Sequence, residues 1–141
     1  LGYIDTDWRQ LQGPNYMYEV DRAVQLHWYL GKSPEIADSR QFDDPYDRLL
    51  AERSDTPGFV SEYAKYSVAE DKAELFCHLM VSYKEVMKRL QWDNTLKRKV
   101  TQMKKLLLSF SDQFNEHFWQ RIMWHQVVAG IRRNGSADRN L

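Results

Sequence analysis

Hydrophobic residues recur at three- and four-residue spacing through the second half of the chain, which is the pattern of amphipathic helices. The pattern predicts a first long helix from Ser67 to about Leu90 and a second that starts at Asp93 or Asn94. A third is predicted from Ser111 or Asp112 to about Gly130. The apolar stripe of the first helix is expected to be Ala69, Ala73, Phe76, Met80, Tyr83 and Met87.

The first half of the chain has a weaker pattern. Residues 1–19 are predicted to be irregular, residues 21–30 to form a short helix, and residues 33–55 to form a long polar surface loop. The fold prediction is a mostly α single domain over residues 1–141, with three long helices packed under an irregular N-terminal region. That region covers residues 1–57, the helical part covers residues 58–131, and residues 132–141 are expected to be a frayed tail.

Composition and charge exclude several classes of function. Hydrophobic residues make up 43% of the 141 residues, enough for a packed core. Lys+Arg and Asp+Glu number 20 each, so the net charge gives no general attraction to nucleic acid or to anionic membranes. No apolar run approaches the roughly 20 residues that span a bilayer. We therefore expect neither a nucleic-acid partner nor a membrane partner, and the sequence indicates no particular compartment.

Two local features have unremarkable interpretations. The second predicted helix is rich in basic residues, but most of them lie off its apolar stripe, which favours a solvated helix face over nucleic-acid binding. These residues are Lys97, Arg98, Lys99, Lys104 and Lys105. Cys77 is the one cysteine, so no disulfide can form within the chain, and it is expected to be inert packing.

Glu70 and Glu74 are the candidate chemical groups of the first long helix. Four residues apart, they share a face about one turn apart and border the expected core. Two such carboxylates repel each other unless a positive partner lies beside them, for example a metal ion or a metal-bound histidine. Each also has a structural interpretation. Ser67-Val68-Ala69-Glu70 is a capping box, and Glu74 could lie on a solvated face or pair with nearby lysines.

A longer string around these residues resembles a known family. Gly58-Phe59-Val60-Ser61, Tyr63-Ala64, Glu70-Asp71 and Ala73-Glu74 resemble the downstream motif of gluzincin-type zinc-binding metallopeptidases and, more distantly, the anthrax lethal factor-like catalytic domain. The start of the chain is similar to the Trp-x-x-Leu-Asn-Pro-x-Phe-x-Tyr segment that follows the zinc helix in that group. The similar residues are Asp7-Trp8, Leu11, Pro14, Tyr16 and Tyr18.

The resemblance implies the second half of a zincin-like domain and peptide-bond hydrolysis by zinc-activated water. Glu70 would be the third protein ligand of the zinc. Tyr63, which by itself would be read as a core aromatic, would donate its hydroxyl to the oxyanion of the tetrahedral intermediate. Glu74 would accept a ring N–H from a zinc-bound histidine. The partner would then be a peptide or protein substrate.

The chain departs from the family because no His-Glu-x-x-His occurs in its 141 residues. The histidines are His27, His78, His117 and His125, and no two are four apart. The resemblance therefore implies that this motif precedes residue 1, and that zinc is a cofactor only if histidines are supplied from outside this chain. Residues 20–55 and Lys72 also depart from the family pattern.

The rival hypothesis is a non-catalytic helical interaction module or pseudo-peptidase, in which Tyr63, Glu70 and Glu74 have core and capping roles. A half-domain would expose the apolar surface that its missing helix should cover. Self-association, or association with an upstream segment, is expected on that ground.

Overall fold

The computed structural model of the chain describes residues 6–22 and 54–137, and this part is mostly helical, with no strand. The predicted mostly α fold is confirmed, whereas its zincin-like character stays a prediction. Within the same ranges, no helix has both the length and the apolar character needed to cross a membrane. The elements are α1 (Thr6–Gln12), the 3₁₀ helix η2 (Tyr63–Lys65), α4 (Val68–Val81), α5 (Tyr83–Arg89), α6 (Asn94–Phe110) and α7 (Glu116–Ala137).

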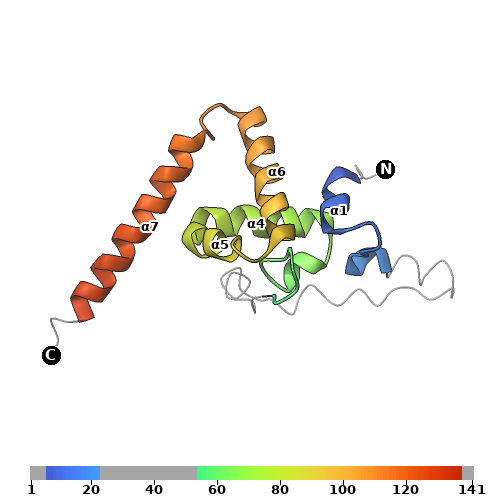
Figure 1. Cartoon of the computed structure of the whole chain (residues 1–141), viewed down its shortest axis with the longest axis horizontal. Coiled ribbons are helices and arrows are strands. Elements are labelled where there is room, and N and C mark those ends of the chain that lie inside the picture. The colour runs from blue at the N-terminus through green and yellow to red at the C-terminus, as the bar shows by residue number, and fades with distance from the viewer. Residues whose placement is uncertain (1–5, 23–53, 138–141) are drawn as a thin grey trace.

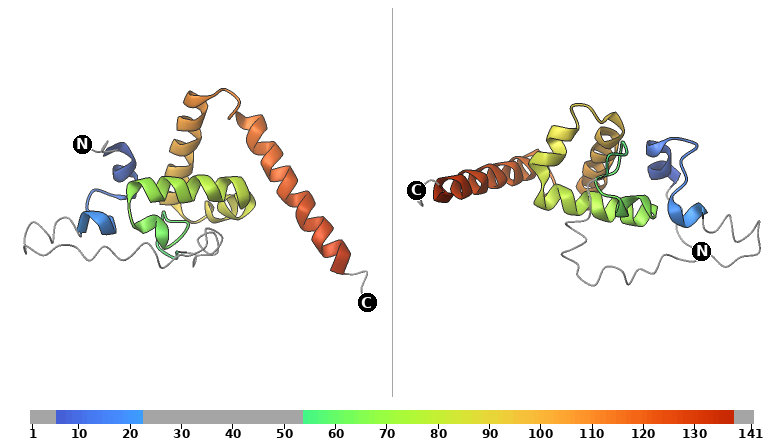
Figure 2. Two further views of the ribbon diagram at one scale, coloured as in Figure 1. Left: turned by 180° about the vertical axis from the view of Figure 1, so that it is seen from behind. Right: turned by 90° about the horizontal axis from the view of Figure 1, so that it is seen from below.

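The helices α1, α4, α5 and α6 gather into one body, and α7 leads away from it (Figure 1). The turned views in Figure 2 show the same arrangement, with α1 and the C-terminal end of α7 at opposite ends of the described structure. Only the first part of α7 therefore lies against the other helices, where it contacts α5.

The first long helix of the sequence prediction is in fact two helices. Ser82 interrupts it with φ −138° and ψ 34°, outside the helical region. The side chain of Gln126 on α7 replaces backbone bonds at the break. Its Oε1 accepts the Lys84 N–H at 2.9 Å, and its Nε2 lies 3.4 Å from the Met80 carbonyl oxygen.

The expected apolar stripe of this helix is wrong in its N-terminal half. Ala69, Ala73 and Phe76 are exposed, whereas Leu75 and Leu79 are fully buried. The helix has apolar residues on two faces, and the face of Leu75 and Leu79 packs inward because Asp71, one turn before Leu75, is anchored in the core by hydrogen bonds.

The start predicted for α6 is confirmed, but both ends predicted for α7 are wrong. Asp93 is the N-cap of α6, and its side chain accepts the Leu96 N–H. Ser111 is the C-cap of α6, so α7 begins only at Glu116, after a turn in which Asn115 Oδ1 accepts the Phe118 N–H at 3.1 Å. The helix continues to Ala137, so residues 132–137 are helical and not a frayed tail.

The N-terminal region is less irregular than predicted. Residues 6–12 form α1, because Trp8 and Leu11 lie on one side of the helix and pack against the core. Residues 19–22 are helical, in line with a short helix near this point. His27, the rest of the helix predicted for residues 21–30, and residues 33–53 of the loop predicted for residues 33–55 lie outside the described residues.

One large hydrophobic cluster holds these helices together. At its centre Trp119 of α7 stacks on Tyr83 of α5, with ring centroids 5.5 Å apart and an angle of 15° between the rings. Trp8 brings α1 into the same cluster. A smaller cluster joins Tyr18, Phe59 and Ala64 beside the N-terminal end of α4. The two clusters meet at the buried carboxylate of Asp71, which accepts hydrogen bonds from Trp8 of the first cluster and Tyr18 of the second.

Candidate functional site

Glu74 is the member of the predicted site that the structure buries. Its carboxylate accepts a hydrogen bond from the Ser61 hydroxyl at 2.7 Å, and Ser61 lies just before η2. Ser61 Oγ also accepts the Ala64 N–H at 3.2 Å. Glu74 therefore ties the segment that carries Tyr63 to helix α4, and it does not lie on the solvated face that its structural interpretation required.

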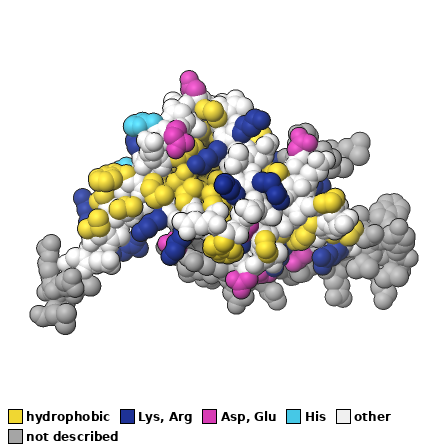
Figure 3. All heavy atoms as spheres, in the orientation of Figure 1, with side chains coloured by type: hydrophobic (Ala, Val, Ile, Leu, Met, Phe, Trp, Pro, Cys, Tyr) yellow, Lys and Arg dark blue, Asp and Glu magenta, His cyan; other side chains and the backbone are white. Residues whose placement is uncertain are grey.

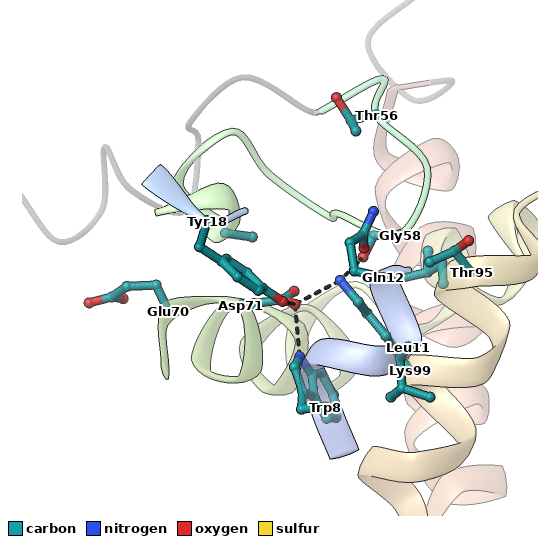
Figure 4. Close-up of polar contacts among 12 residues, drawn as sticks. Trp8, Leu11, Gln12, Tyr18, Thr56, Gly58, Glu70, Asp71, Thr95 and Lys99 are labelled. Atoms are coloured by element: carbon teal, nitrogen blue, oxygen red, sulfur yellow. Dashed lines mark hydrogen bonds and ion pairs between the residues drawn. The ribbon is translucent and has the colours of Figure 1, made fainter. Parts of the chain in front are cut away.

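Glu70 forms only half of the capping box. Ser67 is the N-cap of α4, and its hydroxyl accepts the Glu70 N–H at 3.2 Å. The reciprocal bond, which the Ser67 N–H would donate to the Glu70 carboxylate, is absent. This carboxylate has no hydrogen bond or ion pair within the part of the chain that the structure describes. Figure 4 shows Glu70 pointing away from the buried groups around Asp71. The Glu70 side chain is half-buried.

Tyr63 begins η2, which packs along α4, and its side chain is half-buried. Its ring stacks on Tyr66 with centroids 6.2 Å apart and an angle of 5° between the planes. The helical segments thus bring Tyr63, Glu70 and Glu74 into one region of the molecule, although neither Tyr63 nor Glu74 is bonded to the Glu70 carboxylate.

The three histidines that the structure describes do not add to this region. His78 lies four residues after Glu74, and its Nδ1 is 2.8 Å from the Glu74 carbonyl oxygen, so this nitrogen is engaged with its own helix. His117 and His125 lie exposed on α7. Among residues 6–22 and 54–137, no three His, Cys, Asp or Glu side chains stand close enough to hold a metal ion together. Burial and then the charge of Glu74 raise the pKa of the Cys77 thiol, in keeping with a packing role.

The group that sequence reasoning missed is the Asp71 cluster, which we define as Asp71, Lys99, Trp8, Tyr18 and the Gly58 carbonyl. Asp71 Oδ2 accepts three hydrogen bonds, from Trp8 Nε1 at 2.8 Å, Tyr18 Oη at 2.7 Å and Lys99 Nζ at 2.7 Å. Lys99 Nζ also donates to the Gly58 carbonyl at 2.9 Å. Figure 4 shows Trp8 of α1, Tyr18 of the segment that follows α1, and Lys99 of α6 converging on Asp71. The Asp71 cluster joins four parts of the chain at one oxygen atom.

Burial sets the electrostatics of the Asp71 cluster. Desolvation lowers the pKa of the Lys99 ammonium group, and the neighbouring Asp71 carboxylate opposes that shift. Desolvation and then the Asp71 charge raise the pKa of the Tyr18 hydroxyl. The ring of Phe59 adds a cation–π contact, with Lys99 Nζ 3.9 Å from the ring centroid. Asp71 and Lys99 therefore act as a structural ion pair.

A third buried carboxylate, that of Asp93, fixes the turn before η2. Asp93 Oδ1 accepts the Leu96 N–H at 2.8 Å, and the Gly58 N–H lies 3.0 Å from Oδ2. Arg89 donates to Asp93 Oδ2 at 3.1 Å and to the Thr56 carbonyl at 3.0 Å. Gly58 has φ +89°, and a Cβ there would lie 2.5 Å from atoms of Gln12 and Thr95, so the position requires glycine. The Gly58-Phe59 start of the motif is thus explained by packing.

Sequence signals for the Asp71 cluster exist, although they are weak. Lys99 falls three residues after Leu96 and one before Val100, in register with the buried face of α6. Asp71 is followed four residues later by Leu75, which marks the inner face of α4. Pairing a lysine and an aspartate from different helices requires the tertiary arrangement, which no local spacing specifies.

Comparison with known proteins adds no relative: the chain matches no protein-family model, no curated protein and no solved structure. The functional assignment therefore rests on the residues and contacts described above.

Proposed function

We propose that this chain supplies the third-ligand part of a gluzincin-type zinc peptidase site, with Glu70 as the zinc ligand. The observation that carries the proposal is the half-formed capping box, in which Ser67 caps α4 while the Glu70 carboxylate is bonded to none of the described residues. A carboxylate that served only as a cap would be expected to reach back to the Ser67 N–H.

The surroundings of Glu70 support the same role. Glu74, one turn further on, is held by Ser61, so α4 and the segment that carries Tyr63 keep a fixed relation to each other. On α4 itself, the exposed face that carries Ala69, Ala73 and Phe76 runs beside Glu70. Small residues let another helix approach closely, and Phe76, 37% exposed, would be covered by it.

The described residues provide one zinc ligand, whereas a catalytic zinc takes about three protein ligands and an open position. The remaining ligands would have to be histidines from outside the described residues. Zinc bound there would activate a water molecule for attack on a peptide carbonyl. In the proposed role, Tyr63 donates a hydrogen bond to the carbonyl oxygen as charge develops on it, and Ser61 and Glu74 hold the backbone that carries Tyr63.

The second candidate function is a non-catalytic helical interaction module or pseudo-peptidase, and exposed aromatic residues favour it. Phe110 is 84% exposed at the end of α6, and Trp92 and Trp124 are 66% exposed each. Aromatic residues are enriched at surfaces that bind other proteins.

Zinc content separates the two candidates. We expect about one zinc per chain in the protein purified from its natural source, determined by elemental analysis alongside the intact mass. Because Glu70 would be a direct ligand, a Glu70→Ala variant of the natural gene should lose the zinc. Glu85→Ala, which changes an exposed glutamate on α5, is the matched control and should retain it.

Two results of the zinc analysis would contradict the proposal. A folded helical protein that contains no zinc, with an intact mass equal to that of these 141 residues, would contradict the peptidase proposal and favour the interaction module. Zinc that is retained in full by Glu70→Ala would contradict the ligand role of Glu70.

A further inference from the structure

The part of α7 that leaves the body of the molecule carries an apolar ridge. We define the α7 ridge as Trp124, Val127, Val128 and Ile131, which follow the spacing i, i+3, i+4 and i+7 and therefore line up along one side of the helix. Trp124 is 66% exposed and Ile131 65% exposed. Trp119 faces the opposite way, into the core, so the α7 ridge is not part of the contact between α7 and the body.

Basic residues border the α7 ridge. Arg121, His125 and Arg132 are exposed next to it, and no Asp or Glu follows Glu116 along α7. Basic residues in the last turn of a helix complement its dipole, but the last turn of α7 holds none, so the dipole does not explain these three residues. An open groove runs where the apolar and basic groups meet, lined by Trp124, His125, Val128, Ala129, Arg132 and Arg133. In Figure 3 hydrophobic side chains gather over α7, with Lys or Arg side chains beside them.

We propose that the α7 ridge docks an acidic amphipathic helix of another protein. Apolar anchors at i, i+3, i+4 and i+7 are the spacing with which helices recognise one another, and carboxylates on the incoming helix would meet Arg121 and Arg132. The proposal concerns a different surface from Glu70 and is independent of the zinc-site proposal.

Two other occupants fit the α7 ridge less well. Arg121 and Arg132 border the α7 ridge, and no carboxylate lies near them on the helix. If two copies paired α7 with α7, parallel or antiparallel, arginines would face arginines and repel each other. A membrane-surface helix needs a long, broad apolar face, whereas the α7 ridge extends over only two turns.

The test uses two designed peptides that share one leucine spacing and differ only in their polar positions, which are glutamate in one and lysine in the other. We expect the glutamate peptide to bind the purified protein and the lysine peptide not to bind, as measured by fluorescence anisotropy. Trp124→Ala and Ile131→Ala should each weaken that binding about tenfold or more, as hot-spot residues do. Trp92→Ala, which removes an equally exposed tryptophan from the α5–α6 turn, should leave the binding unchanged.

Circular dichroism checks that each variant remains folded. Any one of three results would then overturn the proposal. The first is no binding of the glutamate peptide, or binding that Trp124→Ala leaves unchanged. The second is binding to phosphatidylserine vesicles that is tighter than binding to the peptide. The third is a concentration-dependent dimer in sedimentation that Trp124→Ala abolishes, which would assign the ridge to a second copy of the chain.

Discussion

Replacing Lys99 by methionine is expected to lower the free energy of unfolding by about 3–5 kcal/mol, because the substitution leaves the buried charge of Asp71 without its cationic partner. Asp71 is only 1% exposed, and its Oδ1 receives no hydrogen bond within the described residues, so its stabilisation comes through Oδ2. Trp8 and Tyr18 would remain as donors to that oxygen, but neither carries a charge. Urea denaturation of the purified protein, followed by circular dichroism, measures the difference.

Two further variants make this prediction specific to the ion pair. Lys97→Met changes an exposed lysine on the same helix and should shift stability by less than about 0.5 kcal/mol. Adding Asp71→Asn to Lys99→Met should recover part of the loss, because the uncompensated charge is then gone. A loss below about 1 kcal/mol for Lys99→Met would show that the Asp71–Lys99 pair is not a major source of stability.

Asp93→Ala is expected to lower the free energy of unfolding by about 2–4 kcal/mol, because the Asp93 carboxylate interacts with three different groups. It caps α6 through the Leu96 N–H, and loss of such a cap costs about 0.5–2 kcal/mol. It also accepts the buried Gly58 N–H, and an unpaired buried donor costs about 1–3 kcal/mol. The pairing with Arg89 would be lost as well. The same denaturation experiment measures the effect.

Asp112→Ala is the matched control for the Asp93 substitution, since Asp112 is an exposed aspartate in the turn before α7. Asp112→Ala should leave the free energy of unfolding almost unchanged. Asp93→Asn, which keeps one oxygen for the Leu96 N–H, should fall between the wild type and Asp93→Ala. Equal stabilities for the two Asp93 variants would contradict the capping part of this explanation.

The ends of a helix could be predicted from the sequence where a capping residue beside an amphipathic run determines them. Asp93 is a strong capping residue ahead of an amphipathic run, and α6 begins where it predicts. The break at Ser82 could not be predicted, because the apolar spacing continues through it and the stabilising contact comes from Gln126 on another helix. The start of α7 was placed too early because Ser111 and Asp112 resemble caps, while Ser111 in fact ends α6.

For the candidate site, the sequence identified side chains but not their surroundings. The string from Gly58 to Glu74 singled out Glu70 and Tyr63 by resemblance. The bond from Ser61 to Glu74 depends on how η2 packs against α4, which no spacing specifies. The inner face of α4 was misassigned because Ala69, Ala73 and Phe76 form an equally regular apolar stripe on its exposed side. That second stripe lies beside Glu70, where the proposed zinc site would need another helix.

A double-mutant cycle between Ser67 and Glu70 tests the central claim most directly, since it asks whether the Glu70 carboxylate belongs to the cap of α4. Denaturation of the wild type, Ser67→Ala, Glu70→Ala and the double variant gives the coupling energy between the two side chains. Ser67→Ala should cost about 1 kcal/mol, as the loss of an N-cap does. The structure predicts a coupling below about 0.3 kcal/mol, because the reciprocal bond of the capping box, which would involve the Glu70 carboxylate, is absent. A coupling as large as the Ser67 effect itself would show that Glu70 is a capping residue and would contradict the proposed role.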